Sequence, residues 1–276
     1  MPGMLYLVPT PIGNLKDISV RCRQTLEEAD FIAAEDTRVT LKLLNHLEIK
    51  KPLISYFEHN KAQKGEWIVE RILAGETCAL VSDAGSPAIS DPGEDLVKQC
   101  AAAGITVCAI PGPCALITAL SISGQSTGRF CFEGFLSTAK KSRKEHLESL
   151  VNEQRTMIFY EAPHKLSATL ESMAEVFGRD RSISLCRELT KLHEEVVRTT
   201  LGNAIAMYKE NPPKGEFVLV VAGAAPAEKK AATAEDAALL VEKLIAQGLS
   251  RKDAVKQAAA ELNLPKNTVY EAALNK

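Results

Sequence analysis

The sequence predicts an α/β protein with two domains and a small helical extension. Short apolar runs alternate with helical patterns from residue 4 to residue 222, which is typical of a mostly parallel sheet covered by helices. A length of 276 residues suggests about two domains. Hydrophobic residues make up 46% and charged residues 25%, so the chain has enough apolar material to fold and is not a disordered protein.

The first α/β domain is predicted over residues 1–124, with proline- and glycine-rich loops that follow its strands. Expected strands cover residues 4–8, 31–34, 53–56, 78–81 and 106–110. Expected helices cover residues 17–29 (capped by Asp17 or Ser19), 37–47, 61–74, 91–103 and 115–123. This alternation indicates an open sheet with its ligand loops at the carboxyl ends of the strands.

A second α/β domain is predicted over residues 125–224 and a helical extension over residues 225–276. In the second domain, expected strands cover residues 130–135, 156–160, 182–187 and 216–222, and expected helices cover 143–153 and 165–177. Fewer helices separate these strands, which favours a mixed sheet. The extension begins with a linker over 223–233, and helices over 234–247, 251–262 and 266–274 then give a helix-turn-helix outline.

Composition excludes several classes of protein. With 33 Lys and Arg against 35 Asp and Glu the net charge is −2, so a polyanion must be held by a local patch rather than by the whole molecule. No apolar run is long enough to span a membrane, and the N-terminus is not typical of a signal peptide. The seven cysteines form no CxxC pair, which argues against disulfides and a zinc site. We expect a soluble cytoplasmic protein without metal or membrane partners.

Three loops follow predicted strands and are candidates for ligand binding: residues 9–14, 82–93 and 110–115. None contains GxGxxG or a phosphate-binding GxxxxGK[ST] pattern, which disfavours a standard nucleotide site. The first loop suits a stiff connection as well as a ligand site. Asp83 is interpreted as a ligand contact, Asp91 as a helix cap, and Cys114 as a packed thiol. Backbone N–H groups at the helix start after Cys114 are expected to be free for a polar ligand.

Charged residues also end several strands. Asp36 is a candidate cap of the helix that follows it, and Arg38 is a candidate partner of Glu35. A structural role and a functional role therefore both stay open for these residues. Charges in 160–165 and 187–191 are expected to face an interdomain cleft, while His164 is interpreted as structural. The positive run over 140–144 suits RNA phosphates, although this run taken alone favours a solvated surface loop.

Taken together, the motifs resemble one family. The sequence is similar to the ribosomal RNA small subunit methyltransferase I group, within the tetrapyrrole-methylase-like class III methyltransferases. The resemblance covers residues 4–222 in motif order and rests on residues 7–14, 34–38, 81–93, 110–115, 133–136, 160–165 and 187–191. Ser86 and Lys165 depart mildly from the family pattern, in which Thr and Arg are expected. The implied fold is the two-domain tetrapyrrole-methylase-like fold.

The resemblance implies a homodimer that uses S-adenosylmethionine to methylate the 2′-oxygen of a cytidine in the decoding region of 16S rRNA, in the small ribosomal subunit. Carried over to this sequence, it implies a set of donor-binding residues: Pro11, Ile12, Asp83, Gly85, Ser86, Ile89, Cys114, Ala115, Tyr160, Leu189 and Phe217. It implies no metal.

A ribose hydroxyl must lose its proton during such a transfer, so a general base is expected within hydrogen-bond reach. Asp36 and Lys191 are ranked first because both lie in charged loops at strand ends, and Glu161 and Glu188 are further candidates. RNA contacts are expected from the positive side chains of Arg38, Lys140, Lys141, Arg143 and Lys144, with help from the tail helices.

Two other functions remain as alternatives. A methylase of a tetrapyrrole or another small molecule would share the fold, but it would not need the basic run or the helical tail. A nucleic-acid-binding regulator without catalysis would use the tail helices and would not bind S-adenosylmethionine.

Overall fold

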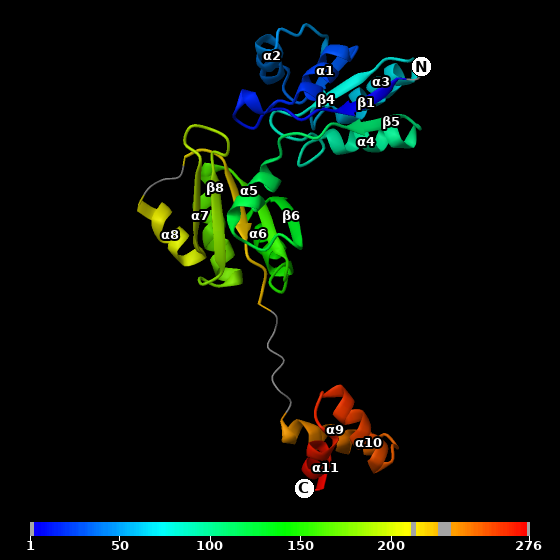
Figure 1. Ribbon diagram of the computed structural model, residues 1–276, viewed down its shortest axis with the longest axis vertical. Coiled ribbons are helices and arrows are strands. Elements are labelled where there is room, and N and C mark those ends of the chain that lie inside the picture. The colour runs from blue at the N-terminus through cyan, green and yellow to red at the C-terminus, as the bar shows by residue number, and fades with distance from the viewer. Residues whose placement is uncertain (1–2, 211–213, 226–232, 275–276) are drawn as a thin grey trace. The chain divides into compact units, whose positions relative to one another are not determined.

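The computed structural model describes residues 3–210, 214–225 and 233–274 (Figure 1). Its contacts divide the chain into an N-terminal unit, Met1–Ala224, and a C-terminal unit, Ala225–Lys276. Most of the linker predicted over 223–233 lies outside the described residues. The α/β class predicted from the sequence is confirmed by two five-stranded sheets, both within the N-terminal unit.

The first sheet is entirely parallel and has the strand order β3-β2-β4-β1-β5. Its strands are β1 (Met4–Leu7), β2 (Phe31–Ala34), β3 (Leu53–Ser55), β4 (Cys78–Val81) and β5 (Thr106–Ala109). Because β1 and β4 are neighbours in the sheet, the loops that follow them leave from the same edge. This edge is where parallel α/β sheets bind ligands.

Helices cover both faces of the first sheet: α1 (Val20–Glu28), α2 (Thr37–His46), α3 (Lys61–Leu73) and α4 (Gly93–Ala102). Ile32 and Ala34 face the cluster of α1 and α2, whereas Phe31 and Ala33 face that of α3 and α4. All four residues of β2 are therefore buried. Burial on both faces explains why this strand is a continuous apolar run rather than an alternating one.

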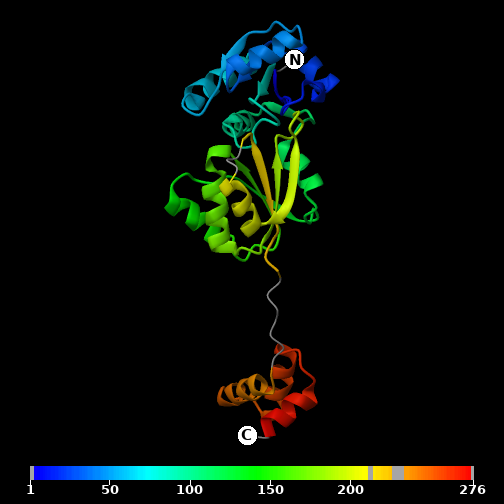
Figure 2. The same ribbon diagram turned by 90° about the vertical axis from the view of Figure 1, so that its left-hand side faces the viewer.

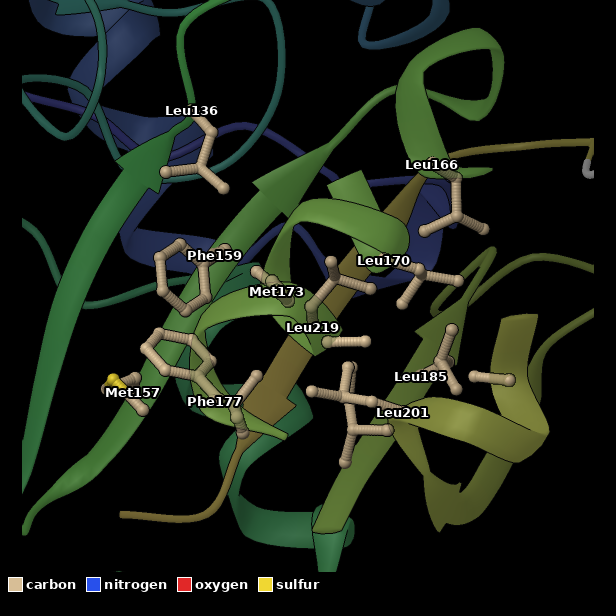
Figure 3. Close-up of a cluster of buried hydrophobic side chains, with 14 of the residues drawn as sticks. Leu136, Met157, Phe159, Leu166, Leu170, Met173, Phe177, Leu185, Leu201 and Leu219 are labelled. Atoms are coloured by element: carbon tan, nitrogen blue, oxygen red, sulfur yellow. The ribbon is translucent and has the colours of Figure 1, made fainter. Parts of the chain in front are cut away.

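The second sheet is mixed, as predicted, with the order β6-β7-β10-β8-β9. Its strands are β6 (Phe130–Phe135), β7 (Thr156–Glu161), β8 (Ser182–Arg187), β9 (Glu195–Thr200) and β10 (Phe217–Val221). Only β6 and β7 pair in parallel among these neighbours, and the other three pairs are antiparallel. One face is covered by α6 (Lys140–Ser149), α7 (Pro163–Phe177) and α8 (Leu201–Glu210). Figure 3 shows Phe159, Leu170 and Leu219 packed in this cluster.

Helix α5 (Ala115–Ser123) covers the opposite face of the second sheet. Leu116 and Leu120 pack with Val218 and Val220 of β10. A domain boundary at residue 124 would separate this helix from the sheet on which it packs. We keep the division of the N-terminal unit into two domains as a proposal, with the change between sheets placed between β5 and α5.

Two elements of the second half were not anticipated, and one begins earlier than expected. Strand β9 and helix α8 follow each other directly over residues 195–210. Val196, Val197, Thr199 and Thr200 are β-branched, which is a usable strand signal. Helix α6 begins at Lys140 rather than at Arg143, so the positive run lies on a helix and not in a loop.

Within residues 233–274, the C-terminal unit contains three helices: α9 (Ala234–Ala246), α10 (Arg251–Glu261) and α11 (Lys266–Leu274), coloured orange to red in Figure 2. Thr233 and Asp236 form a reciprocal capping box on α9. Val241, Ala258 and Val269 bring one buried residue from each helix into a common core. Among the described residues, no helix is both long and apolar enough to cross a membrane.

Truncating Leu219 should destabilise the N-terminal unit strongly. Leu219 is 0% exposed on the central strand β10, so Leu219→Ala leaves a cavity and should cost about 2–5 kcal/mol of unfolding free energy. Leu73→Ala, at a residue that is 61% exposed at the end of α3, should cost less than about 0.5 kcal/mol. Urea unfolding followed by circular dichroism compares the two variants, and equal losses would contradict the assignment of the core.

Candidate active site

The three predicted ligand loops lie side by side at the carboxyl edge of the first sheet. Thr10 and Gly85 exchange two backbone hydrogen bonds of 3.0 Å each, which join the loops after β1 and β4. The Ser86 hydroxyl donates to the carbonyl of Pro113 at 3.0 Å and joins the second loop to the third. Gly85 has a φ of +86°, a conformation that favours glycine. The loops therefore form one rigid rim.

An acidic cavity of about 560 Å³ opens between this rim and the second sheet. A cavity of this size is in the range of small-molecule and cofactor sites. Among its lining residues are five carboxyl groups, one lysine and one histidine: Glu35, Asp83, Asp91, Glu161, Glu216, Lys191 and His164. We call it the acidic cavity because negative side chains dominate its wall.

Three of these carboxyl groups lie on the side of the first sheet, and their pKa values are all raised. Desolvation is the main cause for Glu35, Asp83 and Asp91, and repulsion from neighbouring carboxylates adds to it at Glu35. Asp83 accepts a hydrogen bond from the Asp36 amide at 3.0 Å. Asp91 accepts from the amides of Gly93 and Ala88, so it supports the start of α4, but the N-cap position expected for it is occupied by Pro92. The cavity thus concentrates negative charge that a bound cation would stabilise.

The second sheet contributes an aromatic wall. Tyr160 packs edge-on against Phe132 and Phe135, with ring centroids 4.9 and 5.5 Å apart. Its hydroxyl accepts a hydrogen bond from the Leu116 amide at 3.2 Å, and burial raises the pKa of Tyr160 to about 12. The amide of Leu116 is therefore used within the protein, so the expectation that the N–H groups at the start of α5 are free is wrong for this residue.

Glu161 lines the cavity but is held on both sides of its carboxylate. One oxygen accepts from the Ala162 amide at 2.9 Å and the other from the Thr169 hydroxyl at 2.5 Å. The residue is only 3% exposed. These contacts tie β7 to α7, and a structural role accounts for the residue without a catalytic one.

Lys191 lies in the turn that connects β8 to β9. Its ammonium donates to Glu188 at 2.8 Å and to Glu216 at 2.9 Å. Partial burial by itself would lower the pKa of Lys191. The hydrogen bonds to the two carboxylates have the larger combined effect, so the pKa of Lys191 is raised. The same contact lowers the pKa of Glu188. Lys191 is therefore protonated at neutral pH, and it cannot accept a proton until it has lost one.

Asp36 and Arg38 form a local pair outside the acidic cavity. The Asp36 carboxylate accepts from the Arg38 amide at 2.8 Å and from its guanidinium at 3.0 and 2.7 Å. These bonds lower the pKa of Asp36 to about 2. The suggested pairing of Arg38 with Glu35 is wrong, because Arg38 pairs with Asp36 instead. Asp36 caps α2 and is a poor proton acceptor.

A second, more open cavity of about 800 Å³ adjoins the first. It is lined by Gly13–Lys16, Ile18, His46, Leu47 and Thr190–Leu192, so Lys191 lines both cavities. We call it the basic cavity, because Lys16, His46 and Lys191 line it and none of its described lining residues is Asp or Glu.

Most of the predicted donor-binding residues meet in the acidic cavity. They are Ile12, Asp83, Gly85, Ser86, Ile89, Cys114, Ala115, Tyr160, Leu189 and Phe217. Pro11 is not among its lining residues. Of the candidate bases, Glu161 and Lys191 line the cavity, whereas Asp36 and Glu188 do not.

The predicted RNA contacts lie outside both cavities. Arg143 donates to the Ser172 hydroxyl and to two backbone carbonyls, so it secures α6 within the fold. Lys141 and Lys144 each have a glutamate one turn further along the helix, at 3.9 and 3.7 Å. The two glutamates offset half of the charge of the four Lys and Arg residues in this helix.

Sequence reasoning missed Glu216 and Phe135 in the acidic cavity and interpreted His164 as structural, although it lines the cavity. Glu216 comes directly before β10 and Phe135 ends β6. Their positions at strand ends were visible in the sequence. Among the described residues, no group of three or more His, Cys, Asp or Glu side chains lies close enough together to hold a metal ion.

Comparison with known proteins gives consistent relatives. The family of tetrapyrrole (corrin/porphyrin) methylases matches residues 4–205. The ribosomal RNA small subunit methyltransferase I of Synechocystis sp. is 50% identical and covers 99% of this chain and 98% of its own length. That of Bacillus subtilis is 48% identical, with 98% and 94% covered.

A solved structure extends the similarity to the fold. Uroporphyrin-III C-methyltransferase from Thermus thermophilus, in complex with S-adenosylhomocysteine, superposes with a TM-score of 0.56 at 15% identity, covering 79% of this chain and 97% of its own. The chain therefore belongs to the tetrapyrrole (corrin/porphyrin) methylase family, within its ribosomal RNA small subunit methyltransferase I group.

Proposed function

We propose that this protein transfers a methyl group from S-adenosylmethionine to small-subunit ribosomal RNA, at the 2′-oxygen of a cytidine in the decoding region of 16S rRNA. The observation that carries the donor assignment is the acidic cavity, in which carboxyl groups of both sheets meet beside apolar and aromatic walls. The acceptor follows from relatives that are named for this RNA and match nearly the whole chain. A ribosomal substrate would place the reaction in the cytoplasm, and the family resemblance adds a homodimer to the proposal.

The residues of the acidic cavity fit the proposed donor. S-adenosylmethionine, when bound, supplies a methyl carbon on a positively charged sulfur. Its transfer forms an O–C bond and breaks the C–S bond, whose electron pair stays on the sulfur of S-adenosylhomocysteine, while the hydroxyl proton passes to solvent water. Asp83, Glu35 and Asp91 provide negative charge at the rim, where partial desolvation strengthens their attraction for a cation. Ile12 and Leu189 provide apolar contacts from opposite sides of the interface between the sheets. We propose the ten lining residues predicted from the sequence as the donor site, and Pro11 as a support of the first loop.

The contacts of the four candidate bases suggest different roles for them. Asp36 is held by Arg38, and Glu161 is held by Thr169 and Ala162. Lys191 alone lines both cavities and carries a proton held between two carboxylates. We assign it the role of an ammonium that stabilises negative charge on the acceptor oxygen, instead of the role of a proton acceptor. Preorganised charge of this kind is worth about 10²–10³ in rate.

Methylation of small ribosomal subunits tests the proposal directly. Purified protein and tritiated S-adenosylmethionine should label subunits from cells that lack this gene, and ribose-methylation mapping of 16S rRNA should locate the label at one cytidine. Subunits from cells that carry the gene are the control, because their site is already occupied. Labelling of a uroporphyrinogen instead would favour the small-molecule methylase, and calorimetry without any heat of donor binding would favour the regulator.

Replacing Asp83 by Asn should weaken donor binding about tenfold or more, because a charge-assisted contact is lost. Asn keeps an oxygen that can accept from the Asp36 amide, so the rim should stay in place. Calorimetry measures the affinity, and Glu94→Gln, an exposed change on α4 away from both cavities, is the control. Unchanged affinity in Asp83→Asn would remove this residue from the donor site.

Donor binding should also depend on pH. The pKa values of Glu35, Asp83 and Asp91 are raised, so ionisation of these groups opposes folding. This cost is absent below the ordinary values of 4.5 and 3.8, grows as pH rises from them and is complete above the raised values. A bound cation offsets the cost, so S-adenosylmethionine should raise the melting temperature more at pH 7.5 than at about pH 4, near the ordinary values. A shift that does not change with pH would contradict the electrostatic role of the cluster.

Lys191→Met should lower kcat about a hundredfold while donor affinity stays within a few-fold, because the charge acts on the acceptor oxygen. Lys191→Arg keeps the charge and should keep part of the rate. Asp36→Asn should change kcat only a few-fold, since Asp36 lines neither cavity. Single-turnover methylation of small subunits separates these outcomes. Full turnover in Lys191→Met would exclude the assigned role, and a large loss in Asp36→Asn would restore Asp36 as a candidate base.

Removal of the C-terminal unit should weaken substrate binding more than donor binding. The unit has its own core, and none of its residues within 233–274 lines either cavity. Residues 250–276 hold five Lys and Arg against three Asp and Glu. A chain that ends at residue 225 should therefore bind S-adenosylmethionine as the full chain does, with a raised KM for small subunits. An equal loss of both affinities would show that the unit supports the fold instead.

A further inference from the structure

The basic cavity shares one residue with the acidic cavity and has the opposite charge. The acidic cavity holds five carboxyl groups, whereas Lys16, His46 and Lys191 are the ionisable side chains among the described residues that line the basic one. A cation and a polyanion would therefore be attracted to different sides of Lys191. Methyl transfer needs such a pair of adjoining sites, because the two reactants must be held in contact and aligned.

The rim of the basic cavity exposes apolar side chains. Leu192 is 93% exposed at the tip of the turn between β8 and β9, and Leu15 is 45% exposed in the short 3₁₀ helix η1 (Leu15–Asp17). Leucine is one of the apolar residues that nucleic-acid-binding proteins insert between base steps. Exposed leucines beside lysine and histidine combine the two contacts that a nucleotide needs, one for the base and one for the phosphate.

The wall between the two cavities is held in an unusual conformation. Thr190 has a φ of +66°, which is rare for a β-branched residue. Its hydroxyl oxygen is shielded from solvent and has no hydrogen-bond partner among the described residues. A Cβ on Gly13 would lie 2.9 Å from this oxygen and 2.5 Å from Cγ of Lys191. Strain and an unpartnered polar atom in one residue are typical of segments built for a ligand.

We propose that the basic cavity binds the acceptor nucleotide of the RNA. This inference rests on the proposed function and adds where the RNA substrate binds. The ribose lies against Lys191, the neighbouring phosphates contact Lys16 and His46, and the base packs on Leu192. The residues proposed to hold RNA at the reacting atom are thus different from the positive residues of α6 and the C-terminal unit. The described residues of α6 and of that unit lie outside both cavities.

Two substitutions at the rim test this placement in the full-length protein. Lys16→Glu and Leu192→Asp change exposed side chains, so both variants should keep the melting temperature of the wild type. Matched controls are Lys98→Glu on α4 and Leu73→Asp on α3, which change the same residue types at exposed positions outside both cavities. Initial rates are measured against the concentration of small subunits at saturating donor, and donor affinity is measured by calorimetry.

We expect Lys16→Glu to raise KM for the subunit about tenfold and to reduce the salt dependence of binding, because one phosphate contact is lost. Leu192→Asp should raise KM about as much. Both variants should keep the donor affinity of the wild type, and both controls should behave as the wild type does. Wild-type KM in the two rim variants would overturn the inference, and so would a parallel loss of donor affinity.

A direct measurement of small-subunit binding distinguishes failure of the proposed function from failure of the inference about the basic cavity. If the wild type binds small subunits but transfers no methyl group, the proposed function fails. The inference is then decided by filter binding of labelled subunits. An affinity that is equal in the wild type and Lys16→Glu overturns it, and a tenfold weaker affinity in Lys16→Glu supports it.

Discussion

The close contact between Gly13 and the turn that carries Thr190 and Lys191 is the constraint on which the site depends. It joins the loop after β1 of the first sheet to the connection between β8 and β9 of the second. A side chain at position 13 would meet Lys191 and Thr190 at less than contact distance. Because this contact is tight, Lys191 is fixed between the two cavities, and its pairing with Glu188 and Glu216 holds the turn from the other side.

Three carboxyl groups of the acidic cavity destabilise the folded state when they are ionised, and the same charge favours binding of a cation. Desolvated carboxyl groups at Glu35, Asp83 and Asp91 oppose folding at neutral pH, as their raised pKa values indicate. Pairing them with nearby lysines would remove that cost. The chain instead pairs Lys191 with Glu188 and Glu216, while Asp83 and Asp91 accept hydrogen bonds from backbone amides. Such unbalanced charge is more often found at functional sites than in structural networks.

Much of the fold could be predicted because its signals are local. Buried strands such as β2 are continuous apolar runs, and Ser19, Asp36 and Thr233 are capping residues directly before their helices. The ligand loops could be predicted for the same reason, since each follows a strand of a parallel sheet. Strand β9 and helix α8 were missed although Val196 and Val197 gave a signal, because a charged stretch precedes them.

The partners within the site could not be predicted from sequence, because they depend on distant contacts. Lys191 and Glu216 are 25 residues apart and meet only because β8 and β10 are neighbours. The carboxylate partners that raise the pKa of Lys191 therefore could not be identified from its neighbours in the sequence alone. Arg143 was predicted to contact RNA, yet its guanidinium donates to the Ser172 hydroxyl of α7. Charged residues in the sequence predict which loops form the site, but not which charged side chains remain unpaired in the fold.

The contacts of these side chains also indicate where the rate of such an enzyme originates. Each candidate base is either bound by its own neighbours or protonated, so strong basicity is not what this site provides. Two adjoining cavities of opposite charge provide position instead, and alignment of two reactants supplies about 7–11 kcal/mol. The proton of a hydroxyl that points towards an ammonium becomes easier to remove, because the resulting oxyanion is stabilised as it forms. A lysine fixed between two carboxylates is suited to that role, since its charge is in place before the acceptor arrives.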